Sequence, residues 1–99
     1  MDKQYKTGHT VFEWDTNKAE INKQKHGISF ELATQAFTDS KALIAYDITH
    51  SEQEERYTLL GTVQGVVLVF VVFTENNTIR IISARKATRK EERHYAGTH

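Results

Sequence analysis

Two arginines on one predicted strand are the residues of this chain best suited to chemistry. Arg80 and Arg85 lie in the segment 79–87, whose alternation of residues indicates a strand, and a cationic stretch over 89–95 follows directly. Guanidinium groups hold phosphate well, because they stay charged and donate paired hydrogen bonds to its oxygens. We therefore expect Arg80 and Arg85 to stabilise charge on a phosphate group.

The period of two along a strand decides where these arginines point. In a regular strand Arg80 and Arg85 differ in parity, so their side chains are expected on opposite faces. A bulge would change this, and Arg85 at the strand end could also turn toward the following helix. The alternative for Arg80 is a structural ion pair, with Glu13 or Glu55 as the partner.

A second polar cluster occupies residues 50–57. Cleavage of RNA by its own 2′-hydroxyl needs a base for that hydroxyl, cations for the phosphorane and an acid for the leaving 5′-oxygen. His50 and Glu55 are the acid–base candidates here, and Arg56 is a candidate contact to the phosphate. The alternative is a solvated acidic loop that leads into a strand.

Two further residues are candidate contacts to a nucleic acid. Lys25 closes the first predicted helix, where a cation complements the negative end of the helix dipole and could also bind phosphate. Tyr95 lies on the predicted terminal helix, where it could donate a proton, stack on a base or pack against the sheet.

The charge of the chain is balanced overall but uneven along its length. Lys and Arg together number 13, as do Asp and Glu, which argues against a general nucleic-acid coat. Residues 80–99 nevertheless carry six basic and two acidic side chains. This end of the chain can meet a polyanion, so Lys86 and Arg89 are candidate RNA contacts. The alternative is a solvated charged face.

Several classes of site are not expected from the composition. Because there is no cysteine, disulfides and thiolate metal sites are excluded, and the five histidines lack the spacing of a zinc site. No metal and no cofactor are therefore predicted. The longest apolar run, over 66–73, is too short for a bilayer, which requires about 20 residues. With no signal peptide visible, we expect a cytoplasmic protein without a membrane partner.

The pattern of the chain predicts an α+β fold: an antiparallel sheet with two N-terminal helices and one C-terminal helix. Residues 1–10 are expected to be a flexible lead-in, and residues 11–99 a single domain. The expected helices begin after the N-caps Asp15, Ser29 and Thr88, and the first two run to about Lys25 and Phe37. The expected strands cover 11–14, 42–47, 56–63, 66–74 and 78–85.

Ordered sequence blocks along most of the chain are similar to one known family. The opening blocks are Phe12-Glu13-Trp14-Asp15, Asn22 with Lys25-His26-Gly27-Ile28-Ser29-Phe30-Glu31, and Phe37-Thr38-Asp39. The middle and end blocks are His50-Ser51 with Glu54-Glu55-Arg56-Tyr57 and Gly61, and Ile79 to Ala87 with Glu92-Arg93 and Tyr95. Together they span residues 12–95 and resemble the BrnT toxin family.

The resemblance implies a toxin of a bacterial type II toxin–antitoxin pair with a RelE-like ribonuclease fold. Such a toxin cleaves RNA without a metal and arrests translation and growth. It is neutralised by a cognate antitoxin with a ribbon-helix-helix DNA-binding domain, and the complex represses its own promoter. RNA and this antitoxin are therefore the expected partners.

The chain departs from the family pattern after the central strand. Many relatives carry an arginine behind the Thr-Glu pair, whereas Thr74-Glu75 is followed here by Asn76-Asn77. If that arginine stabilises the transition state, activity is expected to be weak. One alternative is a catalytically weak or inactive binding module that acts only through its antitoxin complex. Another is an RNA-binding domain with no toxin role.

Overall fold

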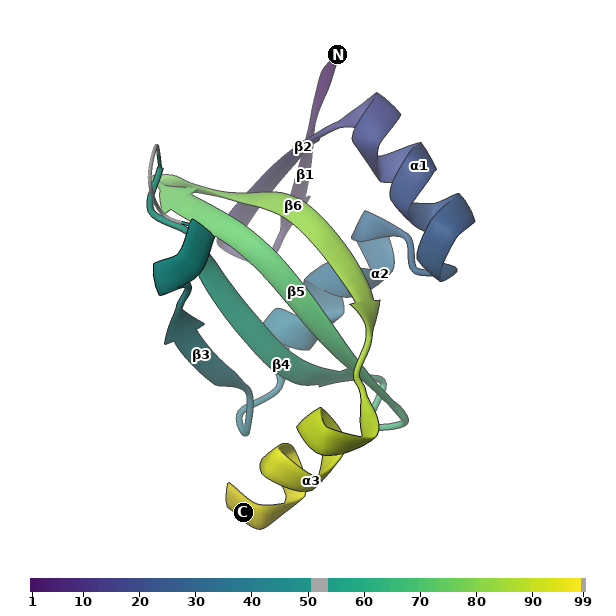
Figure 1. Cartoon of the computed structure of the whole chain (residues 1–99). Helices are drawn as coiled ribbons and strands as arrows, with labels where there is room; N and C mark the ends of the chain where they lie inside the picture. The colour runs from purple at the N-terminus through teal and green to yellow at the C-terminus, as the bar shows by residue number, and fades with distance from the viewer. Residues whose placement is uncertain (51–53, 99) are drawn as a thin grey trace.

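The computed structural model describes residues 1–50 and 54–98, which form a β-sheet packed against helices (Figure 1). Six strands make the sheet: β1 (Asp2–Thr7), β2 (Thr10–Asp15), β3 (Leu43–Tyr46), β4 (Tyr57–Val63), β5 (Val67–Asn76) and β6 (Thr78–Lys86). The described helices are α1 (Thr16–His26), α2 (Phe30–Thr34) and α3 (Arg89–Thr98), with short 3₁₀ turns η1 (Gln35–Thr38) and η2 (Ile48–His50). The predicted α+β class is confirmed.

One pair of strands makes the sheet mixed, so the predicted antiparallel sheet is wrong. The strand order is β1-β2-β6-β5-β4-β3, and β2 runs parallel to β6, with Phe12 opposite Ile79 and Glu13 opposite Arg80. A tight turn forces its two strands to be antiparallel, but β2 and β6 are far apart in the sequence. Their relative direction is therefore a tertiary property that no turn signal could predict.

Residues 2–7 form an edge strand where the sequence predicts a flexible lead-in over 1–10. This strand, β1, pairs with β2 in a hairpin whose turn contains Gly8 at a φ of 60°. Tyr5 packs on Trp14 with a ring-centroid distance of 5.8 Å. The sequence pattern did not predict β1, because an exposed edge strand needs no apolar alternation, only a neighbouring strand with free backbone groups.

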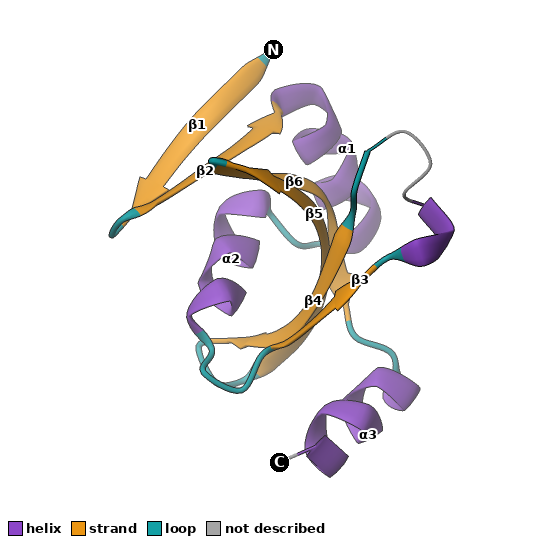
Figure 2. Cartoon of the chain, turned by 90° about the vertical axis from the view of Figure 1, so that its left-hand side faces the viewer, coloured by secondary structure: helices purple, strands orange, loops and turns teal. Residues whose placement is uncertain are grey.

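The core lies on one face of the sheet, under α1 and α2. Figure 2 shows β4, β5 and β6 curving around α2. The largest fully buried side chains come from both layers: Trp14, Phe12, Phe30, Leu59, Val69 and Val71. Burying an aliphatic or aromatic side chain of this size contributes about 1.5–3 kcal/mol. This layer therefore holds the sheet rigid behind its other face.

The other face of the sheet, called the outer face below, is not covered by α1 or α2. Figure 1 looks onto this face, with α3 at its lower end and η2 at its left margin. In β5 the half-buried Phe70 and Val72 alternate with Val69 and Val71, which are fully buried in the core. Phe70 and Val72 therefore belong to the outer face.

The predicted helix starts are confirmed, because they depend on local hydrogen bonds. The side chain of Asp15 accepts a hydrogen bond from the backbone N–H of Lys18 at 2.9 Å, and Gly27 ends α1 in the left-handed region at a φ of 73°. The hydroxyl of Ser29 caps α2 in the same way. The second helix is shorter than expected, because η1 continues it from Gln35 in 3₁₀ geometry.

Asn22 fixes α1 against the edge of β6. Its buried side-chain amide donates to the carbonyl of Ala84 at 2.7 Å and to that of Ile28 at 3.2 Å, and its oxygen accepts from the N–H of Ala84 at 3.2 Å. A buried polar group of this kind must be fully paired. The Asn22 amide thus pairs both backbone groups of Ala84, as a neighbouring strand would. Ala84 directly precedes Arg85, so this contact fixes the strand beside the arginine.

Candidate functional site

A bulge interrupts the pairing of β6 with β5. Val72 pairs with Ser83 and Phe73 pairs with Ile81, so Ile82 has no residue opposite it. One extra residue on a strand shifts the alternation of side chains between the two faces from that point on. Odd-numbered residues therefore face the core before the bulge, and even-numbered residues face it after the bulge.

Because of this bulge, both candidate arginines lie on the outer face. Ile81 and Ala84, on either side of the bulge, are both buried in the core. Arg80 precedes the first of these and Arg85 follows the second, so each arginine points away from the core. The expectation that they point to opposite faces is wrong, and the bulge, which sequence alternation does not reveal, is the reason.

Arg85 is held in place by three groups. Its two terminal nitrogens donate to the two carboxylate oxygens of Glu91 at 2.8 and 3.0 Å, and one of them also donates to the carbonyl of Lys86 at 3.2 Å. The guanidinium carbon lies 4.4 Å from the ring centroid of Phe70, which is a cation–π contact. The hydrogen bonds with Glu91 raise the pKa of Arg85 above its usual value.

Glu91 also begins the helix that follows. Its carboxylate accepts from the backbone N–H of Thr88 at 2.9 Å, and the Thr88 hydroxyl accepts from the N–H of Glu91 at 3.2 Å. This is the capping box predicted from the sequence. Hydrogen bonding to Arg85 is the largest of the effects that lower the pKa of Glu91, so the carboxylate that pairs with Arg85 is charged at neutral pH.

Arg80 is part of an ion-pair network with the N-terminal hairpin. Its two terminal nitrogens donate to Asp2 at 3.0 and 3.1 Å, and one of them also donates to Glu13 at 3.1 Å. Hydrogen bonding to Asp2 is the main cause of a raised pKa of Arg80. Glu13 was foreseen as a partner, whereas Asp2 was missed because its segment was predicted to be loose.

The outer face also contains a hollow of about 410 Å³ beside Arg80, called the acidic hollow. It is lined by Glu13, Glu54, Glu55, Thr74, Glu75, Asn76, Thr78 and Arg80. Glu55, an acid–base candidate, is exposed at this hollow. The structure thus brings Glu55 and Arg80 to one place, among further carboxylates.

Asn76 and Asn77, the departure from the family pattern, have different roles in the backbone. Asn76 is the last residue of β5 and pairs with Thr78, while Asn77 alone adopts the left-handed region, with a φ of 64°. Asparagine tolerates this region better than most residues. Only Asn77 is therefore required for the turn, and Asn76 faces the acidic hollow.

Arg56, another residue of the predicted 50–57 cluster, lies directly before β4. Arg56 donates to the carboxylate of Glu54 at 3.2 Å, and its carbonyl accepts from the N–H of Asp47 at 2.8 Å. Arg56 and Asp47 both line a further hollow of about 360 Å³ on the outer face. The side chain of His50 lies outside the described residues, so its candidate role stays a prediction.

Tyr95 docks α3 on the body of the protein through Asp39. The phenol donates to one carboxylate oxygen of Asp39 at 2.6 Å, and the same oxygen accepts from the N–H and hydroxyl of Thr62 at 2.9 and 3.1 Å. Partial burial by itself would raise the pKa of Asp39. The hydrogen bonds from Tyr95, Thr62 and the N–H of Lys41 outweigh it and lower this pKa to about 2. The hydrogen bond to Asp39 holds the Tyr95 side chain, and its contact with RNA stays a prediction.

The other predicted contacts are exposed cations. Lys86 ends β6, and Arg89 begins α3 immediately beyond it. Arg89 and Arg93 line a shallow hollow of about 500 Å³ on α3, together with Glu92. Lys25 is exposed in the last turn of α1, a different element from the strand and helix that carry the other cations.

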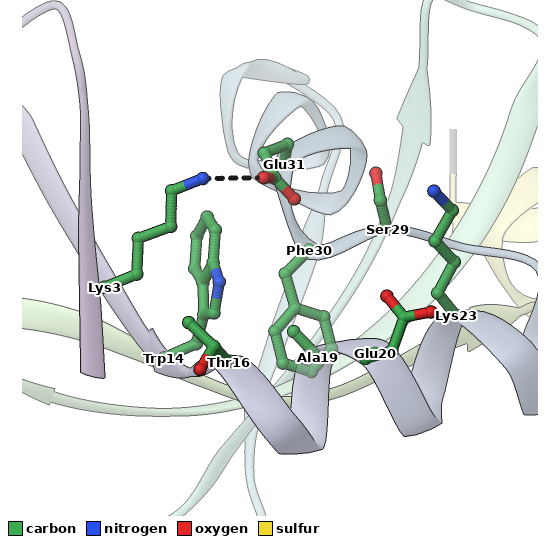
Figure 3. Close-up of a pocket in the computed structure, with 9 residues that line it drawn as sticks. All are labelled: Lys3, Trp14, Thr16, Ala19, Glu20, Lys23, Ser29, Phe30 and Glu31. Carbon is green, nitrogen blue, oxygen red and sulfur yellow. Dashed lines mark hydrogen bonds and ion pairs between the residues drawn. The ribbon is translucent and has the colours of Figure 1, made fainter. Parts of the chain in front are cut away.

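A smaller hollow of about 210 Å³ lies on the core side, between the N-terminal hairpin and the first two helices (Figure 3). An ion pair of 3.1 Å between Lys3 and Glu31 crosses it, and Lys3 also lies over the ring of Trp14. Phe30 packs edge-on against the same Trp14. These contacts join β1 to α2, and none of the predicted site residues lines this hollow.

Two further observations concern the described residues as a whole. Within 1–50 and 54–98, no three His, Asp or Glu side chains gather in a way that could hold a metal ion. None of the described helices has the length and apolar character needed to span a bilayer.

Comparison with known proteins gives one family and one fold. The family model described as the ribonuclease toxin BrnT of the type II toxin–antitoxin system matches residues 14–91. Among solved structures, the chain resembles the crystal structure of the Brucella abortus ribonuclease toxin BrnT, with a TM-score of 0.57 and 22% identity. That match covers 77% of this chain and 94% of the Brucella chain. No curated protein matches the sequence.

The family model extends from β2 into the first turn of α3, so it includes the bulged strand and both candidate arginines. It ends at Glu91, the residue that pairs with Arg85. The structural likeness independently supports the same α+β arrangement. The chain therefore belongs to the BrnT family of ribonuclease toxins of type II toxin–antitoxin systems.

Proposed function

We propose that this chain is a metal-independent endoribonuclease that cleaves cytoplasmic RNA and thereby arrests translation and growth. The observation that carries the proposal is the position of Arg80 and Arg85, which the bulge at Ile82 brings onto one face of a rigid sheet. In Figure 1 no described helix crosses this face between α3 and η2. Cations on a preorganised surface stabilise a developing phosphorane without reorganisation at the moment of reaction.

The proposed reaction uses the substrate's own nucleophile. The 2′-hydroxyl of the RNA gives its proton to a base and its oxygen forms a bond to phosphorus, while the bond from phosphorus to the 5′-oxygen breaks. That oxygen takes a proton from an acid, and the products carry a 2′,3′-cyclic phosphate and a 5′-hydroxyl. The protein has to supply only cations, an acid and a base, so the proposal assigns no role to a metal.

The residues proposed for these roles are those that the sequence suggests. Arg85 and Arg80 stabilise the charge on the phosphorane, and His50 and Glu55 are the acid–base pair. Glu55 has a supporting position, because it lines the same hollow as Arg80. The RNA backbone is proposed to be bound by Lys25, Arg56, Lys86, Arg89 and Tyr95.

The proposed partner is a cognate antitoxin with a ribbon-helix-helix DNA-binding domain. Membership of a type II toxin–antitoxin family implies an antitoxin, and the resemblance of the sequence suggests its class. A complex that binds DNA through the antitoxin would repress its own promoter. The resemblance likewise suggests that the sheet and helices follow the RelE type of ribonuclease fold.

A second candidate function is a weak or inactive module that acts only in its antitoxin complex. One observation favours it: both arginines already have carboxylate partners, Glu91 for Arg85, and Asp2 and Glu13 for Arg80. Such pairs reduce the positive potential offered to a phosphate. If they persist with RNA present, the charge available for catalysis is small.

Purified protein incubated with total bacterial RNA separates these candidates. The endoribonuclease proposal predicts fragments that carry 2′,3′-cyclic or 3′-phosphate ends, formed equally in excess chelator and in added magnesium. Induction without the antitoxin gene should arrest growth, and co-expression of that gene should restore it. Cleavage that needs an added divalent ion would overturn the metal-independent mechanism, and intact RNA with no growth arrest would favour the inactive module.

A further inference from the structure

The outer face contains a hollow of about 360 Å³ that the catalytic proposal does not use, called the Ser83 hollow below. It is lined by Asp47, Thr49, Arg56, Thr58, Phe70, Val72, Ile82 and Ser83. We propose that the Ser83 hollow binds an unpaired nucleobase of the RNA substrate and thereby selects the sequence that is cut. This inference rests on the proposed ribonuclease function and names a substrate subsite for it.

The floor of the hollow is built from three neighbouring strands. Thr58 of β4 pairs with Val72 of β5, and Val72 pairs with Ser83 of β6, so the three side chains form one row across the sheet. The bulge places the side chain of Ile82 beside this row, so that the consecutive residues Ile82 and Ser83 both line the hollow. A regular strand would have turned one of the two toward the core.

The lining combines the two kinds of contact that recognise a base. Phe70, Val72 and Ile82 offer an apolar surface on which the face of a base can lie. The hydroxyls of Thr58 and Ser83 have no hydrogen-bond partner among the described residues, so both are available to the edge of a base. A hydroxyl can donate and accept, which suits every base edge.

Phe70 lies between the Ser83 hollow and Arg85, the residue proposed to stabilise charge on the phosphate. It lines the hollow and also contacts the guanidinium of Arg85, its partner in the β5–β6 pairing. A base bound here would therefore lie beside the residue proposed to hold the adjoining phosphate. Single-stranded RNA is recognised in this way, by stacking of bases next to cations that hold the backbone.

The electrostatics favour a neutral base over a phosphate in the hollow itself. Asp47 and Arg56 both line it, so a carboxylate stands beside the guanidinium. The hydroxyl of Thr49 donates to the Asp47 carboxylate at 2.9 Å, which restricts the movement of that carboxylate. An anion would meet Asp47 as a like charge, whereas a base can donate amino protons to it.

The test uses neutral nucleosides, which carry a base without a phosphate. Adenosine, guanosine, cytidine and uridine are each titrated into the full chain while backbone amide shifts are followed by NMR. At least one nucleoside should shift the amides of Thr58, Phe70 and Ser83. The double variant Thr58→Val, Ser83→Ala should weaken that binding by at least tenfold, equivalent to about 1.4 kcal/mol.

The same double variant is then compared with wild type for the positions at which it cuts RNA. We expect a changed preference among cleavage sites together with an unchanged melting temperature. The control variant Thr7→Val, Ser40→Ala removes the same two hydroxyl types from exposed positions outside the hollow and should keep the wild-type preference.

Each failure has a separate meaning. If RNA is cut but no nucleoside shifts these amides and the double variant keeps the wild-type preference, the base subsite is wrong and the proposed function stands. If a nucleoside binds there but no RNA is cut, the subsite stands and the proposed function fails. If only the antitoxin perturbs these amides, the hollow is a protein-docking surface and the inference is overturned.

Discussion

The carboxylate of Glu91 occupies both terminal nitrogens of Arg85, at 2.8 and 3.0 Å. A substrate phosphate that binds Arg85 must therefore share or displace this partner. Partly exposed ion pairs contribute only about 0–1 kcal/mol, so a phosphate can compete with Glu91 at modest cost. The pair fixes the guanidinium over Phe70 in the free protein, and this preorganisation is useful to a catalyst.

Arg85→Ala should abolish toxicity and RNA cleavage while the protein still folds. Loss of a group that stabilises transition-state charge costs on the order of 100-fold or more in rate. Arg85 is partly exposed, so its removal opens no cavity in the core. Cleavage rate, growth arrest on induction and circular dichroism are measured together, with Lys6→Ala as an exposed-cation control. Full toxicity of a well-expressed Arg85→Ala protein would remove Arg85 from the site.

Arg80→Ala should destabilise the N-terminal hairpin as well as slow cleavage. Its guanidinium links β6 to Asp2 in β1 and Glu13 in β2, so its loss removes the side-chain ion pairs between β6 and the hairpin. Denaturant unfolding and cleavage rates are compared for Arg80→Ala and Arg80→Lys. If the lysine variant recovers stability but not cleavage, Arg80 acts on the substrate. Recovery of both in parallel indicates that Arg80 acts by holding the hairpin.

Acid should weaken the docking of α3 through Asp39. The folded-state pKa of Asp39 is lowered from 3.8 to about 2, so its contribution to stability is present above about pH 4 and is lost as pH falls toward 2. After allowance for solvent screening, the loss is on the order of 1 kcal/mol. Free energies of unfolding measured against pH should show this fall in wild type. Asp39→Asn should remove it, and a variant with the same acid-induced fall as wild type would contradict the assignment.

Asn76→Arg tests whether the departure from the family pattern costs activity. If an arginine at this position acted on the transition state, it would raise cleavage by about tenfold, equivalent to about 1.4 kcal/mol. The structure favours another outcome, because Asn76 faces the glutamates of the acidic hollow, which would neutralise the new guanidinium. We therefore expect cleavage within about twofold of wild type and slightly higher stability. Asn76→Gln is the uncharged control, and a tenfold gain with arginine alone would show that the lost cation mattered.

Charge reversal on α3 should slow association with the antitoxin. Arg89 and Arg93 are exposed beside each other on this helix, and complementary charge speeds encounter more than it adds to affinity. The association rate of Arg89→Glu, Arg93→Glu should fall and lose much of its salt dependence. Stopped-flow measurements over a series of salt concentrations check this, with melting as the control for folding. An unchanged rate at every salt concentration would mean that the antitoxin docks elsewhere, and the acidic hollow would be the next surface to examine.

The helix starts and most strands were predictable because their signals are local. Asp15, Ser29 and Thr88 each cap a helix through a hydrogen bond that spans three residues, so each cap and its partner can be seen together in the sequence. Between β4 and β5, Gln64 and Gly65 both lie at positive φ, and the N–H of Val66 donates to the carbonyl of Val63 at 3.1 Å, so this turn also forms among adjacent residues. These features depend on neighbours along the chain.

The candidate site depends instead on residues that are distant in the sequence. Asp2 reaches Arg80, and Asp39 reaches Tyr95, through contacts that no local pattern encodes. The direction of β2 beside β6 likewise follows from packing and not from a turn. None of these relationships leaves a periodic signal, so alternation and capping could not predict them.

The sequence by itself determined the types of residue available, the order of helices and most strands, and the family, because composition, caps and ordered motifs are properties of the chain. Only the tertiary structure decided which of those residues share a surface. The bulge at Ile82 brings Arg80 and Arg85 to one face, and Glu91 then compensates the charge of Arg85. The physical reason is that strand pairing across the sheet sets where a bulge falls, and a bulge reverses the facing of every residue beyond it.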